Sequence, residues 1–301
     1  MPSAKKSSRL HTFLRRSGST AGLWLLMGAA LYFAEPILFF AILMLVVVLG
    51  LLEYFQLLNL KRAKSEATVT IVIAAGYTAA VFWQAAVDKN SMNFGLYDGV
   101  AIAAIVFGVF IIHLRRQIQP GVNHIAIMAC VFGFIYIPYL FGFCTRIIFF
   151  DDGQHGADVA SPGRGYLLIL LAATKFTDMG AYIVGSLIGK HKMIPNVSPG
   201  KTWEGTIGAI AFTMLAAFGV TWLFPDDVPL LANAPMHTAI LAMLIFLGAV
   251  VGDLAESILK RSLAMKDSGH VMPGIGGVLD LIDSVIFTAP IFYVYLVWLG
   301  P

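Results

Sequence analysis

The side chains best suited to chemistry gather in one short stretch, residues 252–261. On a helix, Asp253, Glu256 and Lys260 share one face with Ser257, because residues three, four and seven positions apart lie on the same side. The stretch ends a long apolar segment, in which ionisable side chains are costly and usually face a cavity or a partner. This polar face therefore indicates a functional site.

A second group of carboxylates begins the next apolar segment. Asp280 and Asp283 are three positions apart and Ser284 follows, which repeats the spacing of the first group. The intervening residues include charged side chains and glycines, among them Lys266, Asp267, Gly276 and Gly277. Glycines let backbone N–H groups approach phosphate oxygens, and basic side chains supply the charge that polyphosphates require.

Clustered carboxylates with few fixed cations suit a divalent ion, most often Mg²⁺, which binds one or two carboxylates together with substrate phosphates. With the glycines and basic residues, they are the parts of a phosphoryl- or nucleotidyl-transfer site. The spacing leaves two other interpretations open. The carboxylates could line a proton or ion path, or Lys260 and Arg261 could neutralise them in a structural network.

Another polar region lies upstream. Asp178 stands within the apolar segment 166–188, and a loop rich in glycine, hydroxyls and lysine follows with Ser198 and Lys201. Its Gly-Lys-Thr sequence, 200–202, is not a Walker A motif, because that motif needs glycine where this chain has Pro195. The loop lysines either bind phosphate or only orient the protein in a membrane.

Composition places these residues in a membrane protein. Of 301 residues, 58% are hydrophobic and 12% are charged, against roughly 45–50% and 25% in soluble domains. Nine apolar runs, the first of them short, are candidates to cross about 30 Å of hydrocarbon. They cover approximately residues 21–34, 37–58, 67–87, 97–114, 122–142, 166–188, 205–224, 237–259 and 279–299. We therefore expect an all-α integral membrane protein.

Basic residues predict the orientation of these spans. With a cytoplasmic N-terminus, sixteen of the twenty Lys and Arg residues fall in inside segments, and only Lys89, Arg146 and Arg164 fall outside. Such a bias is typical of cytoplasmic loops. We expect the N-terminus inside and the C-terminus outside, with the polar loops 189–204 and 260–278 both on the cytoplasmic side.

The chain divides unevenly. Residues 1–20 are predicted to form a basic cytoplasmic tail, 21–165 a transmembrane scaffold of about five helices, and 166–301 a catalytic region of about four helices with two cytoplasmic loops. Ionisable residues of the scaffold, such as Glu53 and His113, lie at span ends and are interpreted as interfacial.

At these residues the chain resembles a known family, the phosphatidate cytidylyltransferases, also called CDP-diglyceride synthetases. The resemblance extends over roughly residues 174–290. Its motifs are residues 178–182, 189–192, 198–205, 257–261, 266–269, 273–274 and 276–277, with Asp280 and Asp283.

The chain departs from the family pattern at two positions. The family usually has His before the paired glycines, where this chain has Ile275, and Arg after the first aspartate, where this chain has Leu281. Lys266, His270 and Lys192 are nearby groups that could supply the missing charge.

The resemblance implies that CTP and phosphatidic acid are converted to CDP-diacylglycerol and pyrophosphate. It implies a metal site formed by Asp253, Asp280 and Asp283, with Lys260 also catalytic. The residues assigned to substrate binding are Asp178, Ser198, Lys201, Ser257, Arg261, Lys266, Asp267, Gly276 and Gly277.

The expected cofactor is Mg²⁺, with room for a second cation. The expected partners are CTP, phosphatidic acid, membrane lipids and, as one open oligomeric state, a second copy of the chain, but no nucleic acid. The expected location is the cytoplasmic (inner) membrane, with the site facing the cytoplasm. An ion-coupled transporter and a nucleotide- or lipid-binding membrane protein without turnover are the alternatives.

Overall fold

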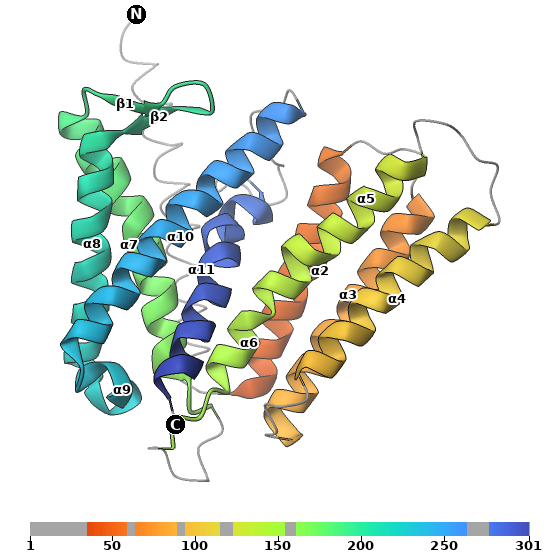
Figure 1. The fold of residues 1–301 in the computed structure, drawn as a ribbon, viewed down its shortest axis with the longest axis horizontal. Helices are drawn as coiled ribbons and strands as arrows, with labels where there is room; N and C mark the ends of the chain where they lie inside the picture. The colour runs from red at the N-terminus through yellow and green to blue at the C-terminus, as the bar shows by residue number, and fades with distance from the viewer. Residues whose placement is uncertain are drawn as a thin grey trace, which may run out of the picture.

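The computed structural model describes residues 35–58, 64–88, 94–114, 123–153, 161–263 and 277–300. Helices make up nearly all of these segments (Figure 1). In chain order the elements are α2 (Pro36–Leu57), α3 (Lys64–Trp83), η1 (Gln84–Asp88), α4 (Phe94–Leu114), α5 (Asn123–Phe134), η3 (Ile135–Tyr139), α6 (Phe143–Ile148), α7 (Arg164–Ile188), β1 (Lys192–Ile194), β2 (Ser198–Thr202), α8 (Trp203–Leu223), η4 (Pro225–Asp227), α9 (Pro229–Ala232), α10 (Pro235–Ser262) and α11 (Val278–Leu299).

Eight helical segments in the described part of the chain are long and apolar enough to cross a membrane. They correspond to eight of the nine spans expected from the sequence. The expected first span, 21–34, and the basic tail lie outside the described residues. The prediction of an all-α, multi-pass membrane protein is confirmed.

The fifth expected span is longer than its apolar run suggests. The predicted segment 122–142 becomes a continuous helical segment, Asn123–Ile148, which contains α5, η3 and α6. Pro138 lies in the π-helical turn in its middle, where a residue without an N–H donor interrupts the regular α-helical pattern. Arg146 therefore lies on a helix and is buried, not in an outside loop.

The helices form two groups that meet at α11 and at α7, which contacts α6 (Figure 1). One group contains α7, α8, α10 and α11, and the other contains α2 to α6; α11 contacts both α2 and α6. Within the first group, α7 and α8 pack closely because Gly180 and Gly208 meet. A Cβ added at Gly180 would lie 2.6 Å from the backbone oxygen of Gly208, and such small-residue contacts let membrane helices approach.

A two-stranded hairpin covers one end of the first group. The sequence predicts only a loop here, but β1 and β2 pair antiparallel, with Lys192 opposite Thr202. Thr202 also caps α8, because its side-chain oxygen accepts the N–H of Gly205 at 3.1 Å. The carboxylate of Glu204 accepts the N–H of Lys190 at 3.1 Å. Strand β2 is thereby held directly on the helix end.

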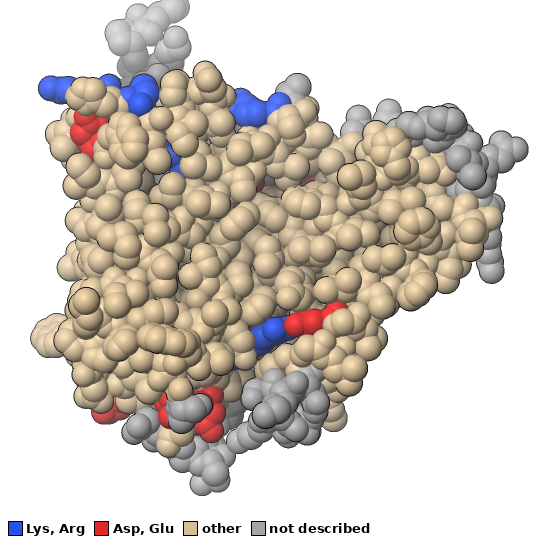
Figure 2. Space-filling model, in the orientation of Figure 1, with Lys and Arg blue, Asp and Glu red and all other residues tan. Residues whose placement is uncertain are grey.

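Charge is concentrated at the two ends of the bundle. In Figure 2 a broad band without charged side chains covers most of the visible surface, and most of the visible blue Lys and Arg atoms gather at the hairpin end. Figure 1 shows that the C-terminal ends of α2, α4 and α10 lie at this same end. An uncharged band between two charged ends suits a protein surrounded by hydrocarbon.

Candidate active site

Close packing of α10 against α11 brings the two predicted carboxylate groups together. Gly252 lies where the helices meet, and a Cβ added there would be 2.6 Å from the backbone oxygen of Asp283. Asp253 follows this glycine on α10. The absence of a side chain at 252 therefore allows the carboxylates of the two helices to face each other.

Three carboxylates form the centre of the site. Asp253, Glu256 and Asp283 each offer an oxygen, and these oxygens all lie within 4.8 Å of one another. Glu256 and Asp283 are only 3% and 6% exposed. Three acidic side chains so close together in a buried place repel one another unless cations stand between them. The donor set, all carboxylate oxygen, is the kind that Mg²⁺ prefers.

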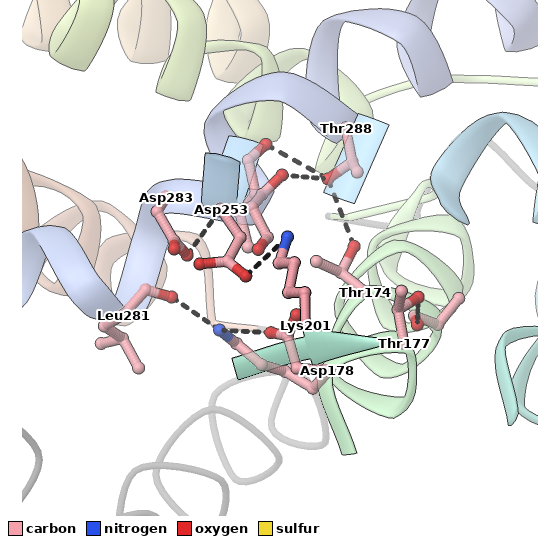
Figure 3. Close-up of polar contacts among 12 residues, drawn as sticks. Thr174, Thr177, Asp178, Lys201, Asp253, Leu281, Asp283 and Thr288 are labelled. Carbon is pink, nitrogen blue, oxygen red and sulfur yellow. Dashed lines mark hydrogen bonds and ion pairs between the residues drawn. The ribbon is translucent and has the colours of Figure 1, made fainter. Parts of the chain in front are cut away.

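Lys201 reaches this centre from strand β2. Its Nζ lies 2.9 Å from Oδ2 of Asp253 and donates a longer hydrogen bond, 3.4 Å, to the carbonyl of Val250. Figure 3 shows the side chain extended toward Asp253, with Asp283 beside it. The hairpin thus positions a cation beside the carboxylates.

Lys260 contacts two carboxylates on the other side of the site. Its Nζ lies 3.0 Å from Oε2 of Glu256 and 2.8 Å from Oδ1 of Asp280. The second oxygen of Asp280 accepts the N–H of Gly277 at 3.0 Å and caps α11. Both oxygens of Asp280 are therefore engaged, and the carboxylate that completes the close group with Asp253 and Asp283 is Glu256. Metal ligation by Asp280 stays a prediction.

Lys175 brings a third cation to the same region. It lies within α7, donates a hydrogen bond of 2.8 Å to the carbonyl of Leu281, and stands 3.8 Å from Oδ2 of Asp178. Leu281 is the position where the family pattern has arginine. An ammonium group on another helix therefore lies against the backbone of the residue that lacks the expected charge (Figure 3).

Threonines connect α7 to its neighbours around this cluster. The hydroxyl groups of Thr174 and Thr288 lie 3.2 Å apart, which joins α7 to α11. The hydroxyls of Thr177 and Thr213 lie 2.6 Å apart, which joins α7 to α8 (Figure 3). Hydrogen bonds between membrane helices of this kind contribute about 0.6–2 kcal/mol each. They fix the helix that carries both Lys175 and Asp178.

A cavity of about 470 Å³ opens onto these side chains. Several predicted site residues line it together: Asp178, Ser198, Lys201, Asp253, Lys260, Asp280 and Asp283. Ser257 and Arg261 lie on α10 but are not part of the cavity lining among the described residues. Lys266, Asp267 and Gly276 lie outside the described residues, as do Ile275 and His270. The roles assigned to all of these residues stay predictions.

Three residues that the structure brings to the site or its edge were given no binding or catalytic role from the sequence. Glu256 had a usable signal, because it shares the polar face with Asp253, one helical turn earlier. Lys175 had another, because a lysine inside an apolar span is a functional candidate. Glu53 was interpreted as interfacial, but it is completely buried and contacts the start of α11. No local pattern around Glu53 predicts that contact.

A known protein family matches this chain. The profile of the cytidylyltransferase family matches residues 15–299, which is nearly the whole chain. The chain belongs to this family. The match includes the N-terminal helices, which by motif alone resembled the family only as a set of apolar spans. Both groups of helices are therefore part of one cytidylyltransferase unit.

Curated relatives give the same result. A phosphatidate cytidylyltransferase of Staphylococcus saprophyticus is 31% identical, over 69% of this chain and 85% of its own length. One of Synechocystis is 29% identical, over 91% of this chain and 94% of its own. An uncharacterized Escherichia coli protein, YnbB, is 41% identical over 44% of this chain and 43% of its own length.

Proposed function

We propose that this cytidylyltransferase transfers the cytidylyl group of CTP to phosphatidic acid, producing CDP-diacylglycerol and pyrophosphate. The observation that carries the proposal is the cavity at the hairpin end of the bundle, lined by carboxylates and lysines. It lies where membrane helices meet polar elements, so a lipid headgroup and a water-soluble nucleotide could both reach it. Relatives named phosphatidate cytidylyltransferase match most of the chain.

The charges around the cavity support a divalent cation. Five carboxylates, from Asp178, Asp253, Glu256, Asp280 and Asp283, surround it and its edge. Three lysines, 175, 201 and 260, contact them. Among the described residues, two formal negative charges therefore remain, which would repel both polyanionic substrates. One Mg²⁺ would balance them, and it supplies Lewis-acid polarisation of phosphate oxygens when bound.

We assign the binding of this ion to Asp253, Glu256 and Asp283. They are the close group of oxygen donors, and Asp253 is the most accessible of the three, with 39% of its side chain exposed. Lys201 and Lys260 border the group on opposite sides. Carboxylates held by lysines in this way keep their orientation before substrate arrives, and such preorganisation is a large part of catalysis by charge.

The transfer itself needs no general base. A phosphate oxygen of phosphatidic acid, already anionic near neutral pH, attacks the α-phosphorus of CTP. The new oxygen–phosphorus bond forms while the bond from the α-phosphorus to the bridging oxygen breaks, and pyrophosphate leaves with the electron pair. The protein must bring two polyanions together in the correct orientation. Lys201, Lys260 and Lys175 can attract the phosphates, and Ser198 on β2 can donate a hydrogen bond.

We place the hairpin end in the cytoplasm of a cell with this protein in its inner membrane. The excess of basic residues in the loops predicted to lie inside supports this orientation. Phosphatidic acid would then enter from the bilayer and CTP from the cytoplasm. The N-terminus would be inside and the C-terminus outside.

A direct assay tests the proposal. Purified protein in detergent or liposomes should convert radiolabelled CTP and phosphatidic acid to a CDP-lipid, and excess chelator should abolish the reaction. Asp253→Asn should lower turnover by on the order of 10²–10³-fold, because it removes a group that orients charge in the transition state. Asp226→Asn is the matched control, since Asp226 is exposed on η4 at the opposite end.

Undiminished turnover in chelator would contradict the metal assignment. Binding of CTP without any product from wild-type protein would support the alternative of a membrane protein that binds nucleotide or lipid without turnover. Substrate-dependent ion flux into liposomes, without product, would support the transporter.

A further inference from the structure

A glutamate of the N-terminal helices contacts the start of α11, next to the active site. Glu53, near the end of α2, is 0% exposed, and its Oε2 accepts the backbone N–H of Leu279 at 3.2 Å. Leu279 belongs to the first turn of α11, where unpaired N–H groups and the helix dipole favour a negative charge. An ionisable group buried so completely in a membrane bundle is costly and usually serves a function.

Gly277 makes room for this carboxylate. A Cβ added at Gly277 would lie only 1.5 Å from Oε1 of Glu53, so any other residue would displace one of the two. The backbone φ of Gly277 is −91°, which every residue type can adopt. Space for Glu53, rather than backbone conformation, is therefore the reason that the structure requires glycine at this position.

The same glycine connects Glu53 to the catalytic side chains. Its N–H donates to Asp280 at 3.0 Å, Asp280 accepts from Lys260 at 2.8 Å, and Lys260 contacts Glu256 at 3.0 Å. Any shift of the first turn of α11 would move Asp280, and Asp280 would then disturb the position of Lys260 and its contact with Glu256. Asp283, one turn further along α11, would move with it.

We infer that Glu53 is a positioning residue for the transfer reaction. Its carboxylate fixes the start of α11, and through α11 it sets the places of Asp280 and Asp283 relative to α10. It does not itself belong to the close carboxylate group of the site. The inference rests on the proposed function and gives the N-terminal helices a specific part in it, beyond that of scaffold.

The test compares two buried glutamates. Glu53→Ala should lower kcat about 10–100-fold, because displacement of a reacting group by about 1 Å can cost 10²-fold. Affinity for Mn²⁺, measured by electron paramagnetic resonance on purified protein without substrate, should fall about tenfold or more, as for other residues that orient metal ligands. Glu66→Ala is the control, since Glu66 is 1% exposed on α3 and contacts His113 instead. It should leave Mn²⁺ affinity unchanged.

Two further variants separate positioning from charge and from folding. Glu53→Gln keeps an oxygen that accepts the N–H of Leu279. Its kcat and Mn²⁺ affinity should therefore stay within about threefold of wild type, since the contribution of this hydrogen bond is preserved. Glu53→Asp withdraws the carboxylate by one methylene and should lower Mn²⁺ affinity while the protein still folds. A loss in the Gln variant equal to that in the Ala variant would overturn the inference.

A double-mutant cycle with Gly277 sharpens the test. Gly277→Ala alone forces the new methyl group against Glu53 and should lower Mn²⁺ affinity strongly. In Glu53→Ala/Gly277→Ala the obstructing carboxylate is absent, so the combined loss should be smaller than the sum of the two single losses. Strict additivity would contradict the contact. Inactive wild-type protein would refute the proposed function, whereas active wild type with unaffected Glu53→Ala would refute only this inference.

Discussion

The two ends of the membrane bundle use charged side chains in different ways. At the end opposite the hairpin, Arg146 contacts Asp98 at 2.5 Å and also donates a hydrogen bond of 3.2 Å to the hydroxyl of Tyr77. The guanidinium lies between two aromatic rings, with centroid distances of 4.8 Å to Phe94 and 4.5 Å to Phe143. One cation meets one anion, and aromatic rings shield the pair. This is the arrangement of a structural contact between helices.

Around the cavity near the hairpin end the charges do not balance. Among the described residues there, carboxylates outnumber lysines, and Lys260 is shared between Glu256 and Asp280. A cavity opens on this cluster, whereas packed aromatic rings cover the Arg146 pair. The Arg146–Asp98 pair shows that a charge in a membrane helix is not by itself evidence of function. An excess of one sign beside an open cavity is better evidence, because it requires a ligand of the opposite sign.

Changing an acid to its amide at each end should have opposite consequences. Glu256→Gln should lower turnover by on the order of 10²–10³-fold, since it removes charge from the preorganised centre. Asp98→Asn should keep turnover per folded molecule within about threefold of wild type but lower the melting temperature, because Arg146 would lose its charged partner. Product formation from radiolabelled CTP and thermal unfolding in micelles measure the two effects. Equal loss of turnover in both variants would contradict the comparison.

Removing the cation at the far end should affect stability alone. Arg146→Met should lower the free energy of unfolding by up to about 3–5 kcal/mol, because the carboxylate of Asp98, only 14% exposed, loses its cation and keeps the hydrogen bond from Tyr77. Arg164→Met should cost less than about 1 kcal/mol, since the Arg164–Asp227 pair is 41% and 26% exposed. Chemical unfolding in mixed micelles provides the free energies. A large effect of Arg164 or a small one of Arg146 would break the distinction between buried and exposed pairs.

Local patterns in the sequence predicted most of the fold and part of the site. Apolar runs of sufficient length identify spans because every backbone group in hydrocarbon must be hydrogen-bonded within the helix. The face shared by Asp253 and Lys260 follows from helical periodicity, and the structure places both side chains at one cavity. The hairpin was missed because its strands are only three and five residues long, and Ser198-Pro199-Gly200 has no alternating pattern.

Contacts between distant segments could not be predicted in this way. Glu53 and Leu279 are 226 positions apart, so their hydrogen bond depends on the packing of α2 against α11. The two hydrogen bonds of Asp280, to Gly277 and Lys260, likewise depend on how the ends of α10 and α11 meet. Spacing alone treats Asp280 and Asp283 as equivalent, whereas their three-dimensional surroundings differ.

Lys175 tests the distinction between structural charges, such as Arg146, and charges that bind a substrate. Its contact with a carboxylate is longer than that of Arg146 with Asp98: among the described residues, Asp178 lies 3.8 Å from Lys175, and 22% of the lysine side chain is exposed. We therefore expect it to contact the phosphate of phosphatidic acid. Lys175→Met should raise the KM for phosphatidic acid about tenfold or more, because hydrogen bonds to charged groups contribute about 1.5–3 kcal/mol.

The KM for CTP and the melting temperature should change little in this variant, and Lys175→Arg should recover much of the affinity for the lipid. Lys190→Met is the matched control, since Lys190 is exposed beside the hairpin and carries the same charge. Initial rates at varied phosphatidic acid in mixed micelles measure both constants. A fall in melting temperature with an unchanged KM would place Lys175 with Arg146, as a structural cation that joins α7 to the carbonyl of Leu281.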